Sequence, residues 1–171
     1  MILLPGVGAF GDAAARLRSH RHGPRRYSGR RLPQASRVAG HLPGDAAACL
    51  RRSFEYGEHQ GLGLDLRARC APSGTVIPSG LAIPHMGWNA LHFPGERPRS
   101  PIFRALEEGT HVYFVHSFAG FDCKGQCTAT TEYGAELTAA VQNGNVYGTQ
   151  FHPEKSGAVG LTILKAFCEL E

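Results

Sequence analysis

An Asn-Gly-Asn turn at residues 143–145 separates two β-type runs and restricts the fold more than any other local feature. Asn-Gly pairs favour the left-handed backbone conformations that a tight β-hairpin requires. Residues 135–142 and 146–151 are therefore predicted to be neighbouring antiparallel strands. Residues 111–118 and 128–133 are rich in β-branched and aromatic side chains, and they predict two further strands.

Helices are predicted near both ends of the chain. Residues 160–170 indicate an amphipathic helix with five apolar side chains on or near one face: Leu161, Ile163, Leu164, Phe167 and Leu170. An apolar run at residues 2–5 predicts a buried strand, and residues 11–18 predict a helix after it. The 171 residues suffice for one core, so we expect a single α/β domain over residues 1–171.

Cysteine usage and hydropathy limit the location of the protein. The five cysteines are an odd number without the density of a disulfide scaffold, which indicates reduced thiols in a cytoplasmic protein. Cys123 and Cys127 lie four apart without a second pair of ligands, so we expect no metal site there. No apolar run is long enough to span a bilayer, and the N-terminus lacks the basic region of a signal peptide.

Net positive charge is confined to one segment of the chain. Residues 16–52 hold ten arginines and one acidic residue, Asp45, for a net charge of +9. The rest of the chain holds eight basic and thirteen acidic residues, for a net charge of −5. A basic arm that binds nucleic acid is one interpretation. Residues 19–50 follow neither a helical nor a strand period, however, and this points to a different origin for the charge.

A histidine and a carboxylate follow the last predicted strand. Residues 147–157 read YGTQFHPEKSG, so His152 lies at the carboxyl end of a strand, where α/β proteins place their ligands. Glu154 follows two residues later, and a carboxylate can fix the tautomer of an imidazole that acts as a general base. Taken alone, the pair would more often be a strand-end histidine beside an unrelated surface carboxylate, since short motifs match by chance.

Other motifs decide in favour of the catalytic interpretation. The His-Pro-Glu run at residues 152–154 resembles that of class I glutamine amidotransferases, whose triad is Cys, His and Glu. Four segments are similar to stretches typical of one branch, the glutamine amidotransferase subunit of imidazole glycerol phosphate synthase: LPGVGAFGDA at 4–13, PHMGWN at 84–89, YFVHSF at 113–118 and ATTEYG at 129–134. The resemblance covers residues 1–18 and about 53–171.

This resemblance implies a fold and a mechanism. The fold would be a mixed, largely parallel sheet with helices on both faces. We expect it to be incomplete at its N-terminal side, because relatives begin with a further strand and helix. A cysteine thiolate would attack the carboxamide of L-glutamine, His152 would relay the proton to the leaving ammonia, and Glu154 would orient His152. The backbone N–H groups around Gly6, Val7 and Gly8 would hold the oxyanion.

The resemblance also implies substrate and partner contacts. Ser117 and Phe118 would lie beside glutamine, and ammonia would pass to a separate cyclase subunit in a heterodimer of histidine biosynthesis. The contact with that subunit would include Met86, Trp88, Asn89 and Lys155. A core position is the alternative for Trp88, but a Gly-Trp-Asn turn favours exposure. No cofactor, metal, nucleic acid or membrane is implied.

The nucleophile of this family is missing from the sequence. It lies on a strand-to-helix elbow of the form Gly-x-Cys-x-Gly, whose glycines allow a sharp turn. No such motif occurs here, and Cys49 has neither a flanking glycine nor a helix N-terminus to lower its pKa. Cys70, Cys123, Cys127 and Cys168 lie in the wrong part of the chain.

A shifted reading frame explains the missing elbow. One allowed codon choice for residues 40–48 is GGG CAT CTG CCT GGG GAT GCA GCT GCT. Read from its second base, it spells Gly-Ile-Cys-Leu-Gly-Met-Gln-Leu, which is the elbow of the family. The cysteine codon straddles Leu42 and Pro43, so no residue of this chain replaces it. We therefore expect residues 19–52 to be out-of-frame translation and the chain as written to be inactive.

Three alternatives stay open at this point: a different class I amidotransferase subunit, a dead amidotransferase that only docks on the cyclase, and a nucleic-acid binder that uses residues 16–52.

We also expect poor folding, because residues 36–43 take the place of the buried elbow strand. There Arg37 and His41 would lack partners, and Pro43 would remove a donor of the sheet ladder.

Overall fold

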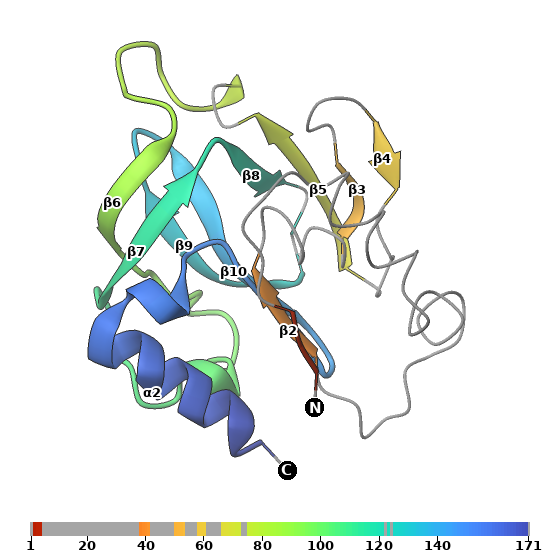
Figure 1. The fold of residues 1–171 in the computed structure, drawn as a ribbon, viewed down its shortest axis with the longest axis vertical. Coiled ribbons are helices and arrows are strands. Elements are labelled where there is room, and N and C mark those ends of the chain that lie inside the picture. The colour runs from red at the N-terminus through yellow and green to blue at the C-terminus, as the bar shows by residue number, and fades with distance from the viewer. Residues whose placement is uncertain are drawn as a thin grey trace.

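The computed structural model describes residues 2–4, 38–41, 50–53, 58–60, 66–72, 75–121, 123 and 125–170 (Figure 1). Its largest sheet has five strands in the order β1-β2-β11-β10-β9. Their bounds are Ile2–Leu4 for β1, Val38–His41 for β2, Cys127–Glu132 for β9, Glu136–Asn143 for β10 and Val146–Thr149 for β11. β1, β2 and β11 are parallel, and β10 is antiparallel to both of its neighbours. The sheet is therefore mixed, as predicted.

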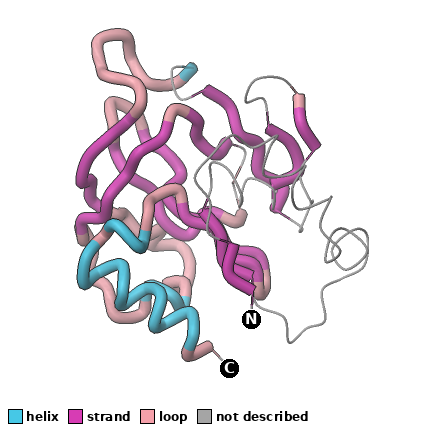
Figure 2. The backbone as a smooth tube through the Cα atoms, in the orientation of Figure 1, coloured by secondary structure: helices cyan, strands magenta, loops and turns pink. Residues whose placement is uncertain are grey.

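Two smaller sheets complete the β-structure, and strands outweigh helices in the described chain (Figure 2). One has the order β4-β3-β5-β8, with bounds of His59–Gln60 for β4, Leu50–Ser53 for β3, Leu66–Pro72 for β5 and Phe118–Phe121 for β8. The other is the antiparallel pair of β6 (His85–Ala90) and β7 (His111–His116). Figure 1 shows this pair and the C-terminal helix on one side of the molecule and β3, β4 and β5 on the other.

The predicted hairpin is confirmed with a tighter turn. Asn143 pairs with Val146, so the loop consists of Gly144 and Asn145 alone. Gly144 has a φ of +54°, a left-handed conformation that a residue without a side chain adopts readily. The strand predicted over residues 111–118 is interrupted at Ser117, where the chain bends between β7 and β8.

The parallel strand β2 lies between β1 and β11. Its residues Val38 to His41 pair with residues 146–149 of β11 in parallel register. Residues 36–43 were predicted to take the place of the elbow strand, and β2 does occupy the parallel part of the sheet beside the strand that leads to His152. The helix predicted over residues 11–18 lies outside the described residues.

Helix α2 (Gly157–Cys168) packs on the main hydrophobic core, which also includes Phe114 of β7 and Tyr147 of β11. It begins three residues earlier than predicted and buries Ile163, Ala166 and Phe167, whereas Leu161 is 67% exposed. Phe167 lies edge-on to Tyr147, with ring centroids 5.7 Å apart. The 3-10 turn η3 (Pro101–Phe103) adds Phe103 to the same core. No helix of the described chain is long and apolar enough to cross a membrane.

Candidate active site

His152 lies three residues beyond β11 and is fixed to a second strand by its backbone. Its N–H donates to the carbonyl of Tyr113 on β7, with an N to O distance of 2.9 Å. Its side chain is only 2% exposed. The hydrogen bond joins the end of the five-stranded sheet to the β6–β7 pair, so two sheets determine where the imidazole lies.

The predicted pairing of His152 with Glu154 is present in the structure. His152 Nδ1 lies 2.7 Å from Glu154 Oε1. Pro153 begins the 3-10 turn η4 (Pro153–Lys155), which brings the two side chains together although Glu154 itself is exposed. A carboxylate accepts hydrogen bonds, so the proton lies on Nδ1 and Nε2 becomes the basic nitrogen. This is the tautomer that a histidine general base requires.

Ser156 braces this turn, and the sequence did not single it out. Its hydroxyl donates to the carbonyl of His152 at 2.7 Å and accepts the backbone N–H of Tyr113 at 3.0 Å. Ser156 is buried, so both of these hydrogen bonds are shielded from water. A serine directly after His-Pro-Glu-Lys is the only sequence signal that could have indicated this role.

Two buried histidines next to the site were also missed. His116 ends β7, and its Nε2 lies 3.0 Å from His85 Nδ1 on β6. His116 Nδ1 lies 2.9 Å from the carbonyl oxygen of Phe118, while His85 Nε2 lies 2.8 Å from Asn89 Oδ1. Burial lowers the pKa of both imidazoles, and repulsion by His85 and His152 helps to lower the pKa of His116 to about 3. Both rings are therefore neutral at pH 7.

Acid should destabilise the fold through His116. Its pKa is about 3 in the folded chain and 6.5 as a free side chain, so between these values only the unfolded chain takes up the proton. The free energy of unfolding is expected to fall by about 1.4 kcal/mol for each pH unit below 6.5 from this histidine alone. Urea unfolding at pH 7, 6 and 5 measures this slope. His116→Gln should make it shallower and the exposed His111→Gln should not; equal slopes in all three proteins would contradict the assignment.

The structure locates the other predicted site residues in two places. Ser117 and Phe118, both half-buried, form the bend that follows His116, whose pKa is sensitive to the charge of His152. Met86 and Trp88 are 59% and 54% exposed on β6, so Trp88 is not a core aromatic. Asn89 is half-buried on the same strand, and Lys155 is exposed beside Glu154.

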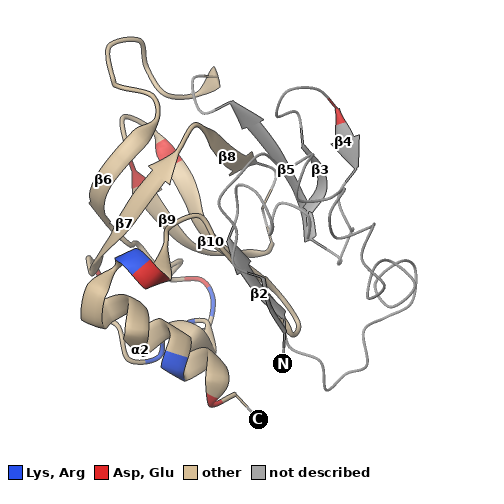
Figure 3. Ribbon diagram, in the orientation of Figure 1, with Lys and Arg blue, Asp and Glu red and all other residues tan. Residues whose placement is uncertain are grey.

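Charge is unevenly distributed around these residues (Figure 3). β6 carries no Lys, Arg, Asp or Glu, whereas Glu154 and Lys155 are adjacent in the turn ahead of α2. The predicted oxyanion residues Gly6, Val7 and Gly8, like Cys49, lie outside the described residues. Within the described part of the chain, no group of three His, Cys, Asp or Glu side chains could hold a metal ion.

Comparison with known proteins identifies the family that this chain resembles. Residues 59–169 match the family model described as glutamine amidotransferase class-I. The chain is 40% identical to the imidazole glycerol phosphate synthase subunit HisH of Moorella thermoacetica, covering 99% of this chain and 76% of that protein. The HisH subunits of Wolinella succinogenes and Methanosarcina acetivorans are 38% and 39% identical, and the chain covers 80% and 79% of their lengths. These alignments extend across residues 19–52.

Solved structures share the fold at lower identity. A crystal structure of a glutamine amidotransferase superimposes with a TM-score of 0.61 at 18% identity, covering 97% of this chain and 78% of the other. A structure of PurLQS from Thermotoga maritima gives a TM-score of 0.60 at 17% identity, with the same coverage. The predicted α/β class and mixed sheet agree with these neighbours.

Proposed function

Because the chain belongs to the class I glutamine amidotransferases and, within them, to the HisH subunits of imidazole glycerol phosphate synthase, we propose that it is the glutaminase subunit of that enzyme. Its reaction would convert L-glutamine to glutamate and ammonia, which passes to the cyclase subunit of a cytoplasmic heterodimer in histidine biosynthesis. We further propose that the chain as written docks on the cyclase without hydrolysing glutamine.

The hydrogen bond between His152 and Glu154 carries the catalytic part of the proposal. At 2.7 Å it sets the Nδ1–H tautomer, which leaves Nε2 as the nitrogen that takes the proton of a thiol and returns it to the leaving ammonia. Burial keeps water from His152, while Ser156 and Tyr113 hold its backbone. Such orientation by packed neighbours is what a general base needs, whatever nucleophile it serves.

Cys123, Cys127 and Cys168, the cysteines whose side chains the structure describes, lie in environments that disfavour a nucleophilic role. Burial raises the pKa of the Cys127 thiol, which donates to the carbonyl of Ala129 at 3.3 Å, and a raised pKa opposes thiolate formation. Cys123 is buried beside Gly120, and Cys168 is exposed at the far end of α2. These environments support inactivity, because nucleophilic catalysis requires an activated thiolate next to the base.

The buried side chain of Gln150 supports the view that a segment which would hydrogen-bond to its amide is missing. Its side chain is fully buried, and neither amide atom has a hydrogen-bond partner among the residues that the structure describes. It follows Thr149, which pairs with His41 at the carboxyl end of β2. Native proteins rarely bury an unpaired amide, since doing so costs about 1–3 kcal/mol. In the frame-shifted interpretation, the nucleophile elbow begins at the carboxyl end of this strand, at the codons for Gly40 and His41.

An uncharged, exposed strand supports the docking part of the proposal. Met86 and Trp88 project from β6, and Trp88 rests edge-on against Tyr113 with centroids 5.9 Å apart. Large aromatic and Met side chains surrounded by uncharged residues are typical of the centres of protein interfaces. The described residues that form this surface all lie outside residues 19–52, the segment in which the elbow is missing.

Docking can be tested with the cyclase subunit of a HisH relative, such as that of Moorella thermoacetica. Isothermal titration should show binding of the full chain, and Trp88→Ala should weaken it about tenfold or more, as expected for a central aromatic residue. Leu161→Ala is the matched control, because Leu161 is an apolar residue on α2 that is 67% exposed, compared with 54% for Trp88. Equal affinity of the two variants would remove β6 from the interface, and no binding by the parent chain would refute docking.

A further inference from the structure

Tyr113, His152 and Ser156 are joined by a closed ring of three hydrogen bonds. The N–H of His152 donates to the Tyr113 carbonyl at 2.9 Å, and the N–H of Tyr113 donates to Ser156 Oγ at 3.0 Å. The Ser156 hydroxyl closes the ring by donating to the His152 carbonyl at 2.7 Å. Both backbone groups of His152 and both of Tyr113 therefore take part, and one hydroxyl supplies the remaining donor and the remaining acceptor.

The hydroxyl of Ser156 takes the place of a strand residue in this ring. Along a regular ladder, the N–H of Tyr113 would donate to a carbonyl of a neighbouring strand. The chain turns away from β7 at Pro153 instead, because η4 begins there and proline has no N–H to continue a ladder. Ser156 follows the turn, and its hydroxyl can accept from Tyr113 while it donates to His152. An alanine at this position would do neither.

Ser156 leaves a favourable role at the start of α2 unused. It is the N-cap residue of this helix, a position where a serine hydroxyl normally accepts a hydrogen bond from a backbone N–H of the first turn. Its side chain makes no such bond, although its carbonyl does begin the helix by accepting from the N–H of Gly160 at 3.2 Å. Local preferences of this kind are set aside mainly at functional sites.

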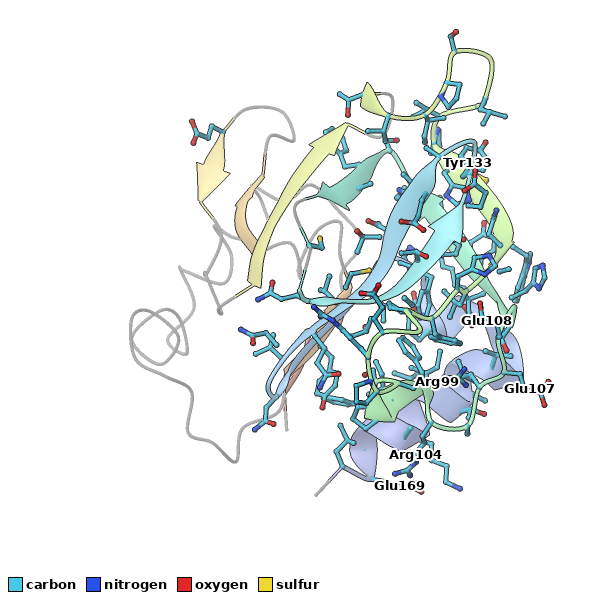
Figure 4. All side chains as sticks on the ribbon, turned by 180° about the vertical axis from the view of Figure 1, so that it is seen from behind. Arg99, Arg104, Glu107, Glu108, Tyr133 and Glu169 are labelled. Carbon is cyan, nitrogen blue, oxygen red and sulfur yellow. The ribbon has the colours of Figure 1, made fainter. Side chains whose placement is uncertain are left out.

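The far end of α2 is held without Ser156. Glu169, the C-cap residue, forms a salt bridge with Arg104, which follows η3, and Figure 4 shows both side chains at this end of the helix. The buried side chains of Ile163 and Phe167 fix the middle and end of α2 on the core. Loss of the Ser156 hydroxyl should therefore loosen η4 and the start of α2 while the rest of the helix stays in place.

The pairing of Glu154 with His152 depends on this ring. The side chain of Glu154 is 59% exposed, whereas that of His152 is 2% exposed. Water competes for an exposed carboxylate, so its hydrogen bond to an imidazole persists only if the two groups are held in place. The ring fixes the backbone of His152, and the restricted φ of Pro153 carries that orientation on to Glu154. Without the ring, the 2.7 Å contact between Nδ1 and Oε1 should open to water.

We propose that Ser156 is a positioning residue, whose hydroxyl sets the Nδ1–H tautomer of His152 by holding this histidine where Glu154 accepts that proton. The consequence for catalysis rests on the proposed function, in which His152 is the general base. The role of Ser156 is indirect, because it acts through the backbone of His152 and Tyr113 and not on the reacting atoms.

Histidine tautomers measure this role directly. In the full chain labelled with 15N at histidine, two-bond 1H–15N correlation at pH 7 shows which ring nitrogen carries the proton. His152→Asn identifies the signals of His152 among those of the nine histidines. The parent should show His152 protonated on Nδ1, and Glu154→Ala should give the mixed tautomers of an imidazole without a fixed acceptor. Ser156→Ala should shift His152 most of the way to that mixture although Glu154 is still present.

Thr162→Ala is the matched control, because Thr162 Oγ1 also donates to the carbonyl four residues earlier, that of Ala158, at 2.9 Å. This variant should keep the parent pattern. If Ser156→Ala does not fold, Ser156→Cys decides the question. Its thiol fills the same site but is a weak donor and acceptor, so His152 should show a partial shift toward mixed tautomers.

An unchanged Nδ1–H tautomer of His152 in Ser156→Ala or in a folded Ser156→Cys, even with a lower midpoint of unfolding, would reduce Ser156 to a structural role and overturn the proposal. The pattern of free histidine at His152 in the parent would overturn it as well. The measurement needs neither glutamine nor a nucleophile. A tautomer shift without glutamine hydrolysis by the chain translated in the corrected frame would refute the glutaminase assignment alone, whereas hydrolysis without the shift would refute the positioning role alone.

Discussion

We expect the chain as written to release no glutamate from glutamine, even when the cyclase subunit and its ligand are present. His152 and Glu154 are paired at 2.7 Å, but on the proposed account they have no thiol to activate. Removing the nucleophile of a catalytic triad lowers kcat by on the order of 10⁶-fold, which places the remaining rate below detection in a coupled glutamate assay. A version translated in the corrected frame, which restores the Gly-Ile-Cys-Leu-Gly elbow, should hydrolyse glutamine and lose this activity on His152→Ala.

The control for this experiment is Cys49, the one cysteine of the aberrant segment. Glutamate release by the chain as written that persists after His152→Ala indicates a contaminating glutaminase. Release that is abolished by both His152→Ala and Cys49→Ser would show that Cys49 is a working nucleophile, and the proposed inactivity would be wrong.

Gly160→Ala should destabilise the fold and displace η4, the turn that holds Glu154 beside His152. In an exposed helix, replacing Gly by Ala stabilises by about 1 kcal/mol. Here a Cβ atom on Gly160 would lie 1.7 Å from the carbonyl oxygen of Pro153 and 2.7 Å from its carbonyl carbon. Relief of this overlap requires α2 and η4 to separate, and overpacking of this kind costs about 1–3 kcal/mol or more. The clash therefore outweighs the helix preference, and the temperature of unfolding should fall by several degrees.

Gly95→Ala is the matched control, because a Cβ there meets no atom within 4 Å. Thermal unfolding followed by circular dichroism should give the same midpoint for Gly95→Ala and the parent and a lower one for Gly160→Ala. An unchanged or raised midpoint in Gly160→Ala would show that α2 does not approach Pro153 so closely.

Local patterns were sufficient to predict the C-terminal half of the fold. Asn-Gly turn chemistry and alternating β-branched residues led to β9, β10 and β11 within one or two residues at most strand ends. The start of α2 was missed because Ser156 and Gly157 carry no helical signal, and the helix is stabilised there by packing on η4. β5 was also missed, although Leu66, Ala68 and Cys70 alternate with Arg67 and Arg69.

The site was only partly predictable for a different reason. His152 and Glu154 are two residues apart, so their contact follows from a motif. His85 and His116 are separated by 31 residues, and they meet only because β6 and β7 pair in one particular register. Ser156 likewise bonds to Tyr113 across 43 residues. Such contacts depend on tertiary pairing, which a periodic pattern in the sequence does not contain.

The central claim is that a glutaminase domain has its nucleophile elbow translated out of frame. Sequencing the gene across the codons for residues 18–53 tests this claim most directly. The codons for residues 40–48 should spell Gly-Ile-Cys-Leu-Gly-Met-Gln-Leu when read from their second base. Insertions or deletions should flank them, one near codons 18–36 and a compensating one near codons 49–53. Codons that do not spell this elbow in the shifted frame would contradict the claim and leave residues 19–52 as a genuine part of the protein.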